Sequence, residues 1–305
     1  MLGLVAFALA SNGEGKNNLV LYWGQSSGGG QADLVEYCTD DVDIIALAFL
    51  YGFGNGDYRL DFANKWCPNY QGSTLLDCEK IGQDIKACQA KGKKVILSMG
   101  GAVGSYTAGN PQTLAKDIYN LFLGGTSSTR PFHDAVLDGV DLDLGNKHPQ
   151  GFAEFINALK ALDPKIMAAS APQCVYPDAS CQEALDGAPF DWVFVQFYNN
   201  VCAPPGASNV NLDRPCEWDD PNNCRFNWDI WHDWAEKVSP NKNVKLWLGT
   251  PGGASAAGSG YLGFDKLGPA LDAIEDKTHF AGIMMWDAHQ AFENKQGSLT
   301  CAQAA

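Results

Sequence analysis

Residues 138–145 read Asp-Gly-Val-Asp-Leu-Asp-Leu-Gly, and this stretch organises both the fold and the site that the sequence predicts. In a β-strand, side chains alternate between two faces, so Asp141 and Asp143 share one face while the valine and leucines take the other. Two carboxylates about 7 Å apart, beside residues that favour burial, carry a desolvation and repulsion cost that packing does not explain. The pattern therefore predicts a functional site. The next position on its acidic face is Gly145, which has no side chain.

Short β-rich apolar runs recur along the chain, with helical or loop material between them. Several are hydrophobic almost throughout, as buried parallel strands are, and separations of roughly 20 to 50 residues leave room for crossover helices. The runs are 19–23, 43–49, 94–99, 135–144, 166–171, 192–198, 244–248 and 282–286, and the expected helices are 75–90, 113–123, 151–162, 226–238 and 264–274.

This alternation predicts a single (β/α)8 barrel, an α/β fold of about 250 residues. A doubly wound open sheet is the alternative, but it normally carries a Gly-rich phosphate turn after an early strand. The glycine-rich stretch 24–30 lacks the residues that would complete such a motif, so we interpret it as a rim loop. Residues that follow barrel strands share one rim, where barrel enzymes place their sites. Polar and small residues do follow the runs: Gly24, Gln25, Ser26, Gly100, Gly101, Gln173, Asn199, Asn200 and Asp287.

Charge and cysteine content restrict the possible partners and the compartment. A formal net charge of −14 argues against a nucleic acid or an anionic membrane as partner, because the protein would repel both. Ten cysteines without CxxC pairs favour disulfides and a secreted, extracellular protein over zinc binding. Five histidines without metal-ligand spacing give no reason to expect a metal.

The first ten residues form an apolar run that ends in Ala-Leu-Ala. We interpret residues 1–10 as a signal-peptide remnant, although the run lacks a basic start; a native apolar segment or a cloning remnant is the alternative. Residues 11–305 then form the barrel. The run is too short to span a membrane.

The stretch 138–145 resembles the DGxDxDxE motif on the fourth strand of glycoside hydrolase family 18, the chitinases, and differs from it only at the final fixed position. The resemblance extends from about residue 19 to about residue 292 and is closest to the plant and fungal class III endochitinases. It rests further on 21–25 (Leu-Tyr-Trp-Gly-Gln), 97–101 (Leu-Ser-Met-Gly-Gly), 122–125 (Phe-Leu-Gly-Gly), 171–174 (Ala-Pro-Gln-Cys), 195–200 (Val-Gln-Phe-Tyr-Asn-Asn) and 285–286 (Met-Trp).

The resemblance implies hydrolysis of β-1,4-linked N-acetylglucosamine polymers by a substrate-assisted retaining mechanism, in which the substrate's acetamido oxygen attacks the anomeric carbon. Asp143 would orient the acetamide and stabilise the oxazolinium, and Asp141 would share a proton with Asp143. Tyr198 would donate a hydrogen bond to the acetamido oxygen, and Trp286 would form an apolar floor under the sugar. The partner would be chitin or a chito-oligosaccharide, bound by a monomer without a cofactor. The remaining predicted substrate-binding residues are Tyr22, Phe49, Gly101, Ala102, Gln173, Gln196 and Asn199.

Gly145 stands where the family's catalytic glutamate would protonate the leaving oxygen. General acid catalysis contributes typically about 10²–10⁴-fold, so we predict little or no hydrolysis but retained binding. Asn146 is neutral and has the wrong strand parity, and Lys147 is cationic, so neither replaces the acid.

The change at position 145 has two possible origins. We favour a Glu-to-Gly change introduced into an active chitinase, because the rest of the constellation is intact. The alternative is a natural non-catalytic chitinase-like lectin or enzyme inhibitor. A barrel enzyme with another substrate is a third possibility.

By resemblance, Cys38 pairs with Cys88, Cys67 with Cys78 and Cys174 with Cys202, while Cys181 and Cys301 are left unassigned. The acidic segment 216–224 is bracketed by cysteines, and we interpret it as a rim loop held by a local disulfide rather than as a cation site. Asp41 and Asp43 are expected at the opposite rim, facing solvent.

Overall fold

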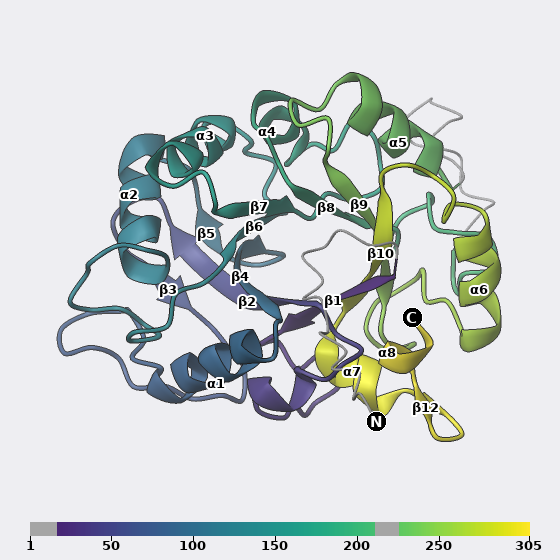
Figure 1. The fold of residues 1–305 in the computed structure, drawn as a ribbon, viewed down its shortest axis with the longest axis horizontal. Coiled ribbons are helices and arrows are strands. Elements are labelled where there is room, and N and C mark those ends of the chain that lie inside the picture. Colours follow the sequence, from purple (N-terminus) through teal and green to yellow (C-terminus); the bar gives the residue numbers. More distant parts are fainter. Residues whose placement is uncertain (1–16, 211–225) are drawn as a thin grey trace, which may run out of the picture.

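Eight parallel strands close into a barrel in the computed structural model, which describes residues 17–210 and 226–305 (Figure 1). Each strand pairs with the next along the chain, and β1 pairs with both β2 and β10, which closes the sheet. The predicted (β/α)8 barrel is therefore confirmed. Its strands are β1 (Asn18–Trp23), β2 (Ile44–Phe53), β4 (Lys94–Gly101), β6 (Gly139–Leu144), β7 (Met167–Ser170), β8 (Trp192–Gln196), β9 (Lys245–Pro251) and β10 (Phe280–Trp286).

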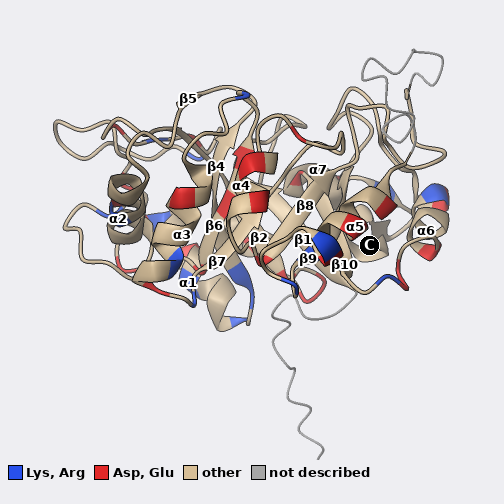
Figure 2. Cartoon of the chain, turned by 90° about the horizontal axis from the view of Figure 1, so that it is seen from above, with Lys and Arg blue, Asp and Glu red and all other residues tan. Residues whose placement is uncertain are grey.

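Helices surround the barrel (Figure 1), and several carry charged residues of both signs, as on α3 and α6 in Figure 2. None of the helices in the described part of the chain is long and apolar enough to cross a membrane. The helices are α1 (Glu79–Ala90), α2 (Pro111–Phe122), α3 (Phe152–Leu162), α4 (Gln182–Gly187), α5 (Trp228–Lys237), α6 (Phe264–Asp272), α7 (Ala288–Glu293) and α8 (Cys301–Ala304), with a 3-10 helix η1 (Leu34–Tyr37).

All five predicted helices are present, with shifted ends. α1 begins at Glu79 rather than at residue 75, because Leu76 forms a β-bridge with Asn69. α2 begins two residues early, where the Asn110 side chain accepts a hydrogen bond from the Thr113 amide and Pro111 takes the first helical position. Four short strands complete the secondary structure: β3 (Arg59–Leu60), β5 (Ser105–Tyr106), β11 (Lys295–Gln296) and β12 (Leu299–Thr300).

Strand alternation divides the core into two buried layers. Val140, Leu142 and Leu144 of β6 belong to the layer between strands and helices, as the sequence predicts. A second cluster fills the barrel itself and contains Tyr22, Phe49, Trp192, Phe194, Trp247 and Met284, among others. These large side chains pack the interior, so an open site forms only at an end of the barrel.

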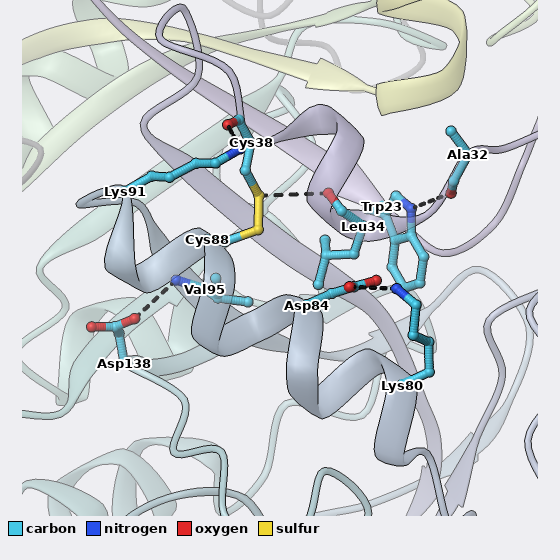
Figure 3. The surroundings of a disulfide bond; sticks show 10 residues. All are labelled: Trp23, Ala32, Leu34, Cys38, Lys80, Asp84, Cys88, Lys91, Val95 and Asp138. Carbon is cyan, nitrogen blue, oxygen red and sulfur yellow. Dashed lines mark hydrogen bonds and ion pairs between the residues drawn. A yellow bond between two sulfur atoms is a disulfide. The ribbon is translucent and has the colours of Figure 1, made fainter.

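Three disulfides join Cys38 to Cys88, Cys67 to Cys78 and Cys174 to Cys202, as predicted. The first links the residue after η1 to α1 (Figure 3). The third ties together the loops that follow β7 and β8. Cys181 and Cys301 are buried free thiols, and the predicted disulfide within 216–224 lies outside the described residues.

The three aspartates of the 138–143 stretch lie at two different levels of the barrel. Asp138 precedes β6 and accepts a 2.9 Å hydrogen bond from the Val95 amide (Figure 3), so the strand begins after Asp138 and not at residue 135 as predicted. Asp43 and Asp191 make the same kind of contact, accepting from the Leu19 amide of β1 and from the Ala168 amide of β7. Asp43 is therefore half-buried rather than facing solvent, whereas Asp41 is exposed as expected.

Candidate active site

A cavity of about 820 Å³ opens at the carboxyl ends of the strands. All eight barrel strands, or the loops that follow them, contribute to its wall. Ten of the predicted site residues line it: Phe49, Gly101, Ala102, Asp143, Gly145, Gln173, Gln196, Tyr198, Asn199 and Trp286. The other two, Tyr22 and Asp141, are buried inside the barrel.

Asp141 is fully buried on the inner face of β6. Its Oδ2 atom accepts hydrogen bonds from Tyr22 Oη at 2.8 Å and from Ser98 Oγ at 2.7 Å. Its Oδ1 atom has no hydrogen-bond partner among the described residues. Burial raises the pKa of Asp141 to about 6, because the charged form loses its hydration.

Asp143 lies one step further along the same face and borders the cavity. Gln196 Nε2 donates a 2.9 Å hydrogen bond to Asp143 Oδ1. Burial, followed by the charge of Asp141, raises the pKa of Asp143 to about 8, although the bond from Gln196 acts in the opposite direction. Two neighbouring carboxylates with raised pKa values keep at least one proton between them near neutral pH.

Amide side chains fix the orientation of Gln196. Gln196 Nε2 also donates to the Ala171 carbonyl at 2.8 Å, and Gln196 Oε1 accepts from Gln173 Nε2 at 3.1 Å. Asn200 Nδ2 in turn donates to Gln173 Oε1. The bond to Asp143 is therefore part of a continuous network from the loops after β7 and β8.

Aromatic side chains form the opposite side of the cavity. Trp286 stacks on Phe49 with ring centroids 5.8 Å apart and planes 19° apart. Tyr198 is buried, and its pKa is raised well above its usual value by burial and by the nearby charges of Asp143 and Asp141. Its phenol therefore keeps its proton and can donate a hydrogen bond into the cavity.

Two predicted substrate contacts also have structural roles. Asn199 Oδ1 accepts from the amides of Gly258 and Ser259, which holds the loop after β9. Gly101 has φ +88°, and a Cβ atom there would lie 3.0 Å from the Phe49 ring, so this position requires glycine.

Gly145 lines the cavity wall. Its amide donates a 2.8 Å hydrogen bond to Tyr106 Oη. A Cβ atom at this position would meet nothing closer than the Gly101 carbonyl oxygen at 3.6 Å, which is ordinary van der Waals contact. A Cβ atom therefore fits here without displacing the backbone of the neighbouring residues.

The two residues after Gly145 differ in their placement. Asn146 Nδ2 donates to the Tyr106 carbonyl, whereas Lys147 lines the cavity and its amide donates to Ser180 Oγ. Two further carboxylates line the cavity, but Asp61 accepts from the Ala63 amide and Asp178 accepts three backbone amides. Within residues 17–210 and 226–305, no group of three or more His, Cys, Asp or Glu could hold a metal ion.

Sequence reasoning missed two residues of this network. Ser98, which supports Asp141, has inward strand parity within the Leu-Ser-Met-Gly-Gly stretch, so alternation alone would have found it. Asp178 lies in a loop, and its local sequence gives no comparable signal.

The structure is a closed barrel with paired inner carboxylates and aromatic side chains at its carboxyl rim. The chain belongs to the glycosyl hydrolases family 18, because residues 18–261 match the sequence profile of that family. It is 43% identical over 298 residues to Chitinase 1 of Rhizopus niveus, covering 94% of this chain and 56% of that protein. The chain spans about half the length of several curated fungal chitinases that it matches.

Two solved plant structures share the fold. The chitinase ICChI of Ipomoea carnea is 30% identical with a TM-score of 0.72, over 90% of this chain and 96% of that chain. The xylanase and alpha-amylase inhibitor protein XAIP-II of Scadoxus multiflorus is 30% identical with a TM-score of 0.73, over 90% of this chain and 94% of that chain. The same scaffold thus occurs in a chitinase and in an inhibitor.

Proposed function

We propose that this barrel binds chito-oligosaccharides in the cavity and hydrolyses them little or not at all. The observation that carries the proposal is that position 145 has no side chain. Asp143, Tyr198 and Trp286 line the cavity and Asp141 is buried beside Asp143 inside the barrel, while the next residue on the acidic face, Gly145, lines the cavity without a side chain.

The retained residues fit the substrate-assisted chemistry of the family. Asp143, held by Gln196, would orient the N-acetyl group so that its oxygen attacks the anomeric carbon. Asp141 Oδ1, which lacks a partner among the described residues, would accept a proton from Asp143 as positive charge develops on the oxazolinium. Tyr198 would donate to the acetamido oxygen, and Trp286 would support the sugar ring.

The step that fails is departure of the leaving sugar. Without a proton donor at position 145, the glycosidic oxygen must leave as an alkoxide, and loss of general acid catalysis costs typically about 10²–10⁴-fold in rate. Binding depends on the other residues and persists.

The origin of Gly145 separates two proposals. An introduced Glu-to-Gly change in an active class III endochitinase is favoured by the intact surroundings and by the room for a Cβ atom at position 145. A natural inhibitor or lectin is the second candidate, favoured by the likeness to a protein described as a xylanase and alpha-amylase inhibitor. For either candidate, we propose a secreted monomer whose barrel lies within residues 11–305, preceded by a signal-peptide remnant; the three disulfides are compatible with an oxidising compartment.

Calorimetry with chitotetraose, followed by chromatography of the same sample, tests the proposal. We expect heat of binding and intact tetrasaccharide. Cellotetraose, which has the same linkage but no acetamido group, is the matched control and should bind much more weakly. Rapid cleavage of chitotetraose, or no binding at all, would contradict the proposal.

A further inference from the structure

Asp178 lies in the loop between β7 and α4 and is only 7% exposed. Its Oδ1 atom accepts hydrogen bonds from the amides of Ser180 at 2.8 Å and Cys181 at 2.6 Å. Its Oδ2 atom accepts from the Gln173 amide at 3.1 Å. One carboxylate therefore holds both ends of the segment 173–181, which forms part of the cavity wall.

The first branch from Asp178 leads to Asp143. The side chain of Gln173 donates to Gln196 Oε1 at 3.1 Å, while Gln196 Nε2 donates to the Ala171 carbonyl at 2.8 Å. A donor at the oxygen and an acceptor at the nitrogen permit only one orientation of the Gln196 amide. In that orientation, Gln196 Nε2 points to Asp143 Oδ1 at 2.9 Å.

The second branch leads to position 145. Ser180, whose amide is held by Asp178, accepts a 3.0 Å hydrogen bond at Oγ from the Lys147 amide. Gly145 lies two residues before Lys147 and is held from the other side by Tyr106. The loop organised by Asp178 therefore also fixes the direction of the chain at position 145.

We propose that Asp178 is a positioning residue of the site: through Gln173 and Gln196 it aims a donor at Asp143, and through Ser180 it sets the chain direction at position 145. The effect of Asp178 on the binding and turnover of substrate rests on the proposed function. Asp178 borders the cavity, but both its carboxylate oxygens accept backbone amides, so in this proposal it acts by holding the loop and not on the reacting atoms.

Two variants separate the branches. Asp178→Asn keeps the size of the side chain and one oxygen for the amides of Ser180 and Cys181, but places an NH₂ group against the Gln173 amide. Ser180→Ala removes only the contact to Lys147. Asp134→Asn is the matched control, because Asp134 is exposed and pairs with Lys86 on the surface.

Nuclear magnetic resonance of the Gln196 side-chain amide reports on the first branch without any ligand. Asp178→Asn should shift these signals, whereas Ser180→Ala and Asp134→Asn should leave them in place. For chitotetraose, Asp178→Asn should weaken binding about fivefold, as expected for one hydrogen bond. In a Gly145→Glu background, it should lower kcat about fivefold or more, with a smaller change in KM.

Unchanged Gln196 signals in a folded Asp178→Asn protein would overturn the proposal. If that variant does not fold, hydrogen exchange in the unmodified chain decides: the amides of Gln173, Ser180 and Cys181 should exchange slowly and together, and fast exchange at Gln173 would overturn it. Shifted Gln196 signals in a chain that does not bind chitotetraose would support the positioning role and reject the proposed function.

Discussion

The amide of Gly145 donates a hydrogen bond to Tyr106 Oη over 2.8 Å, and the same hydroxyl donates to the Gly101 carbonyl over 3.0 Å. This hydroxyl thereby joins the end of β6 to the end of β4, whose neighbouring backbones border the cavity. A Cβ atom at position 145 would lie 3.9 Å from that hydroxyl oxygen. Position 145 is therefore held in place by its backbone, while a Cβ atom there would make only ordinary van der Waals contacts.

Removing the Tyr106 hydroxyl tests this link. Tyr106→Phe leaves the buried ring in place but deprives the Gly145 amide and the Gly101 carbonyl of their partner, so the free energy of unfolding should fall by about 1–2 kcal/mol. Urea unfolding measures the change. Tyr119→Phe, half-buried on α2, is the control and should cost less. Equal losses in the two variants would contradict the assigned role of Tyr106.

The carboxylate pair predicts a pH dependence of stability. The pKa values of Asp141 and Asp143, about 6 and about 8, lie above the ordinary value of 3.8. Between about pH 4 and pH 8, the folded protein therefore holds protons that the unfolded chain releases, and the free energy of unfolding falls as the pH rises through this window.

Asp143→Asn removes one of these groups and keeps an oxygen for Gln196. Its free energy of unfolding should exceed that of the unmodified protein by about 1–3 kcal/mol at pH 8.5, and the two should converge below pH 4. Urea unfolding at both pH values measures this. Asp134→Asn is the control, and its change in the free energy of unfolding should have the opposite sign, because the hydrogen bond from Lys86 lowers the pKa of that exposed carboxyl. A gain of the same size at both pH values would be inconsistent with the raised pKa values.

The aromatic wall predicts the main apolar contribution to binding. Trp286→Ala should weaken chitotetraose binding about tenfold or more, because it removes the ring that stacks on Phe49 and faces the cavity. Trp286→Phe should retain part of the affinity. Trp66 is 84% exposed and absent from the cavity wall, so Trp66→Ala is the matched control. Calorimetry that finds the same affinity in both alanine variants would rule out Trp286 as the floor of the site.

The barrel and the central acids were predictable because they depend on short-range patterns. Period-two alternation placed Asp141 and Asp143 on the inner face, and the near-continuous apolar runs marked the eight strands. The helices α4, α7 and α8 were missed, since six residues or fewer show too little periodicity to distinguish them from loops.

The support of the site was less predictable because it depends on contacts between distant residues. Tyr22 and Asp141 lie 119 positions apart and meet only when the barrel closes. The run 135–144 included Asp138 because a stretch of apolar residues does not show where the strand begins; β6 starts one residue after Asp138. The role of Asp178 depends on loop geometry that its neighbours in the sequence do not encode.

If the proton donor is missing, the rate of cleavage should depend strongly on the leaving group. A dinitrophenyl group departs as a stable phenolate without a proton, whereas a sugar does not. The unmodified chain should therefore cleave a dinitrophenyl chitobioside at least about 10²-fold faster than it releases sugar from a chito-oligosaccharide. Stopped assays with both substrates measure the ratio, and the Gly145→Glu variant should narrow it. A ratio that Gly145→Glu leaves unchanged would argue against a defect in protonation.

The most direct measurement compares chitotetraose hydrolysis by the unmodified chain, Gly145→Glu and Gly145→Gln. Glutamate and glutamine have nearly the same size, but only glutamate can deliver a proton to the leaving oxygen. We predict that the rate of hydrolysis rises about 10²–10⁴-fold in Gly145→Glu and does not rise in Gly145→Gln, with all three proteins binding the tetrasaccharide. Hydrolysis by the unmodified chain at the rate of Gly145→Glu, or equal gains in both variants, would contradict it.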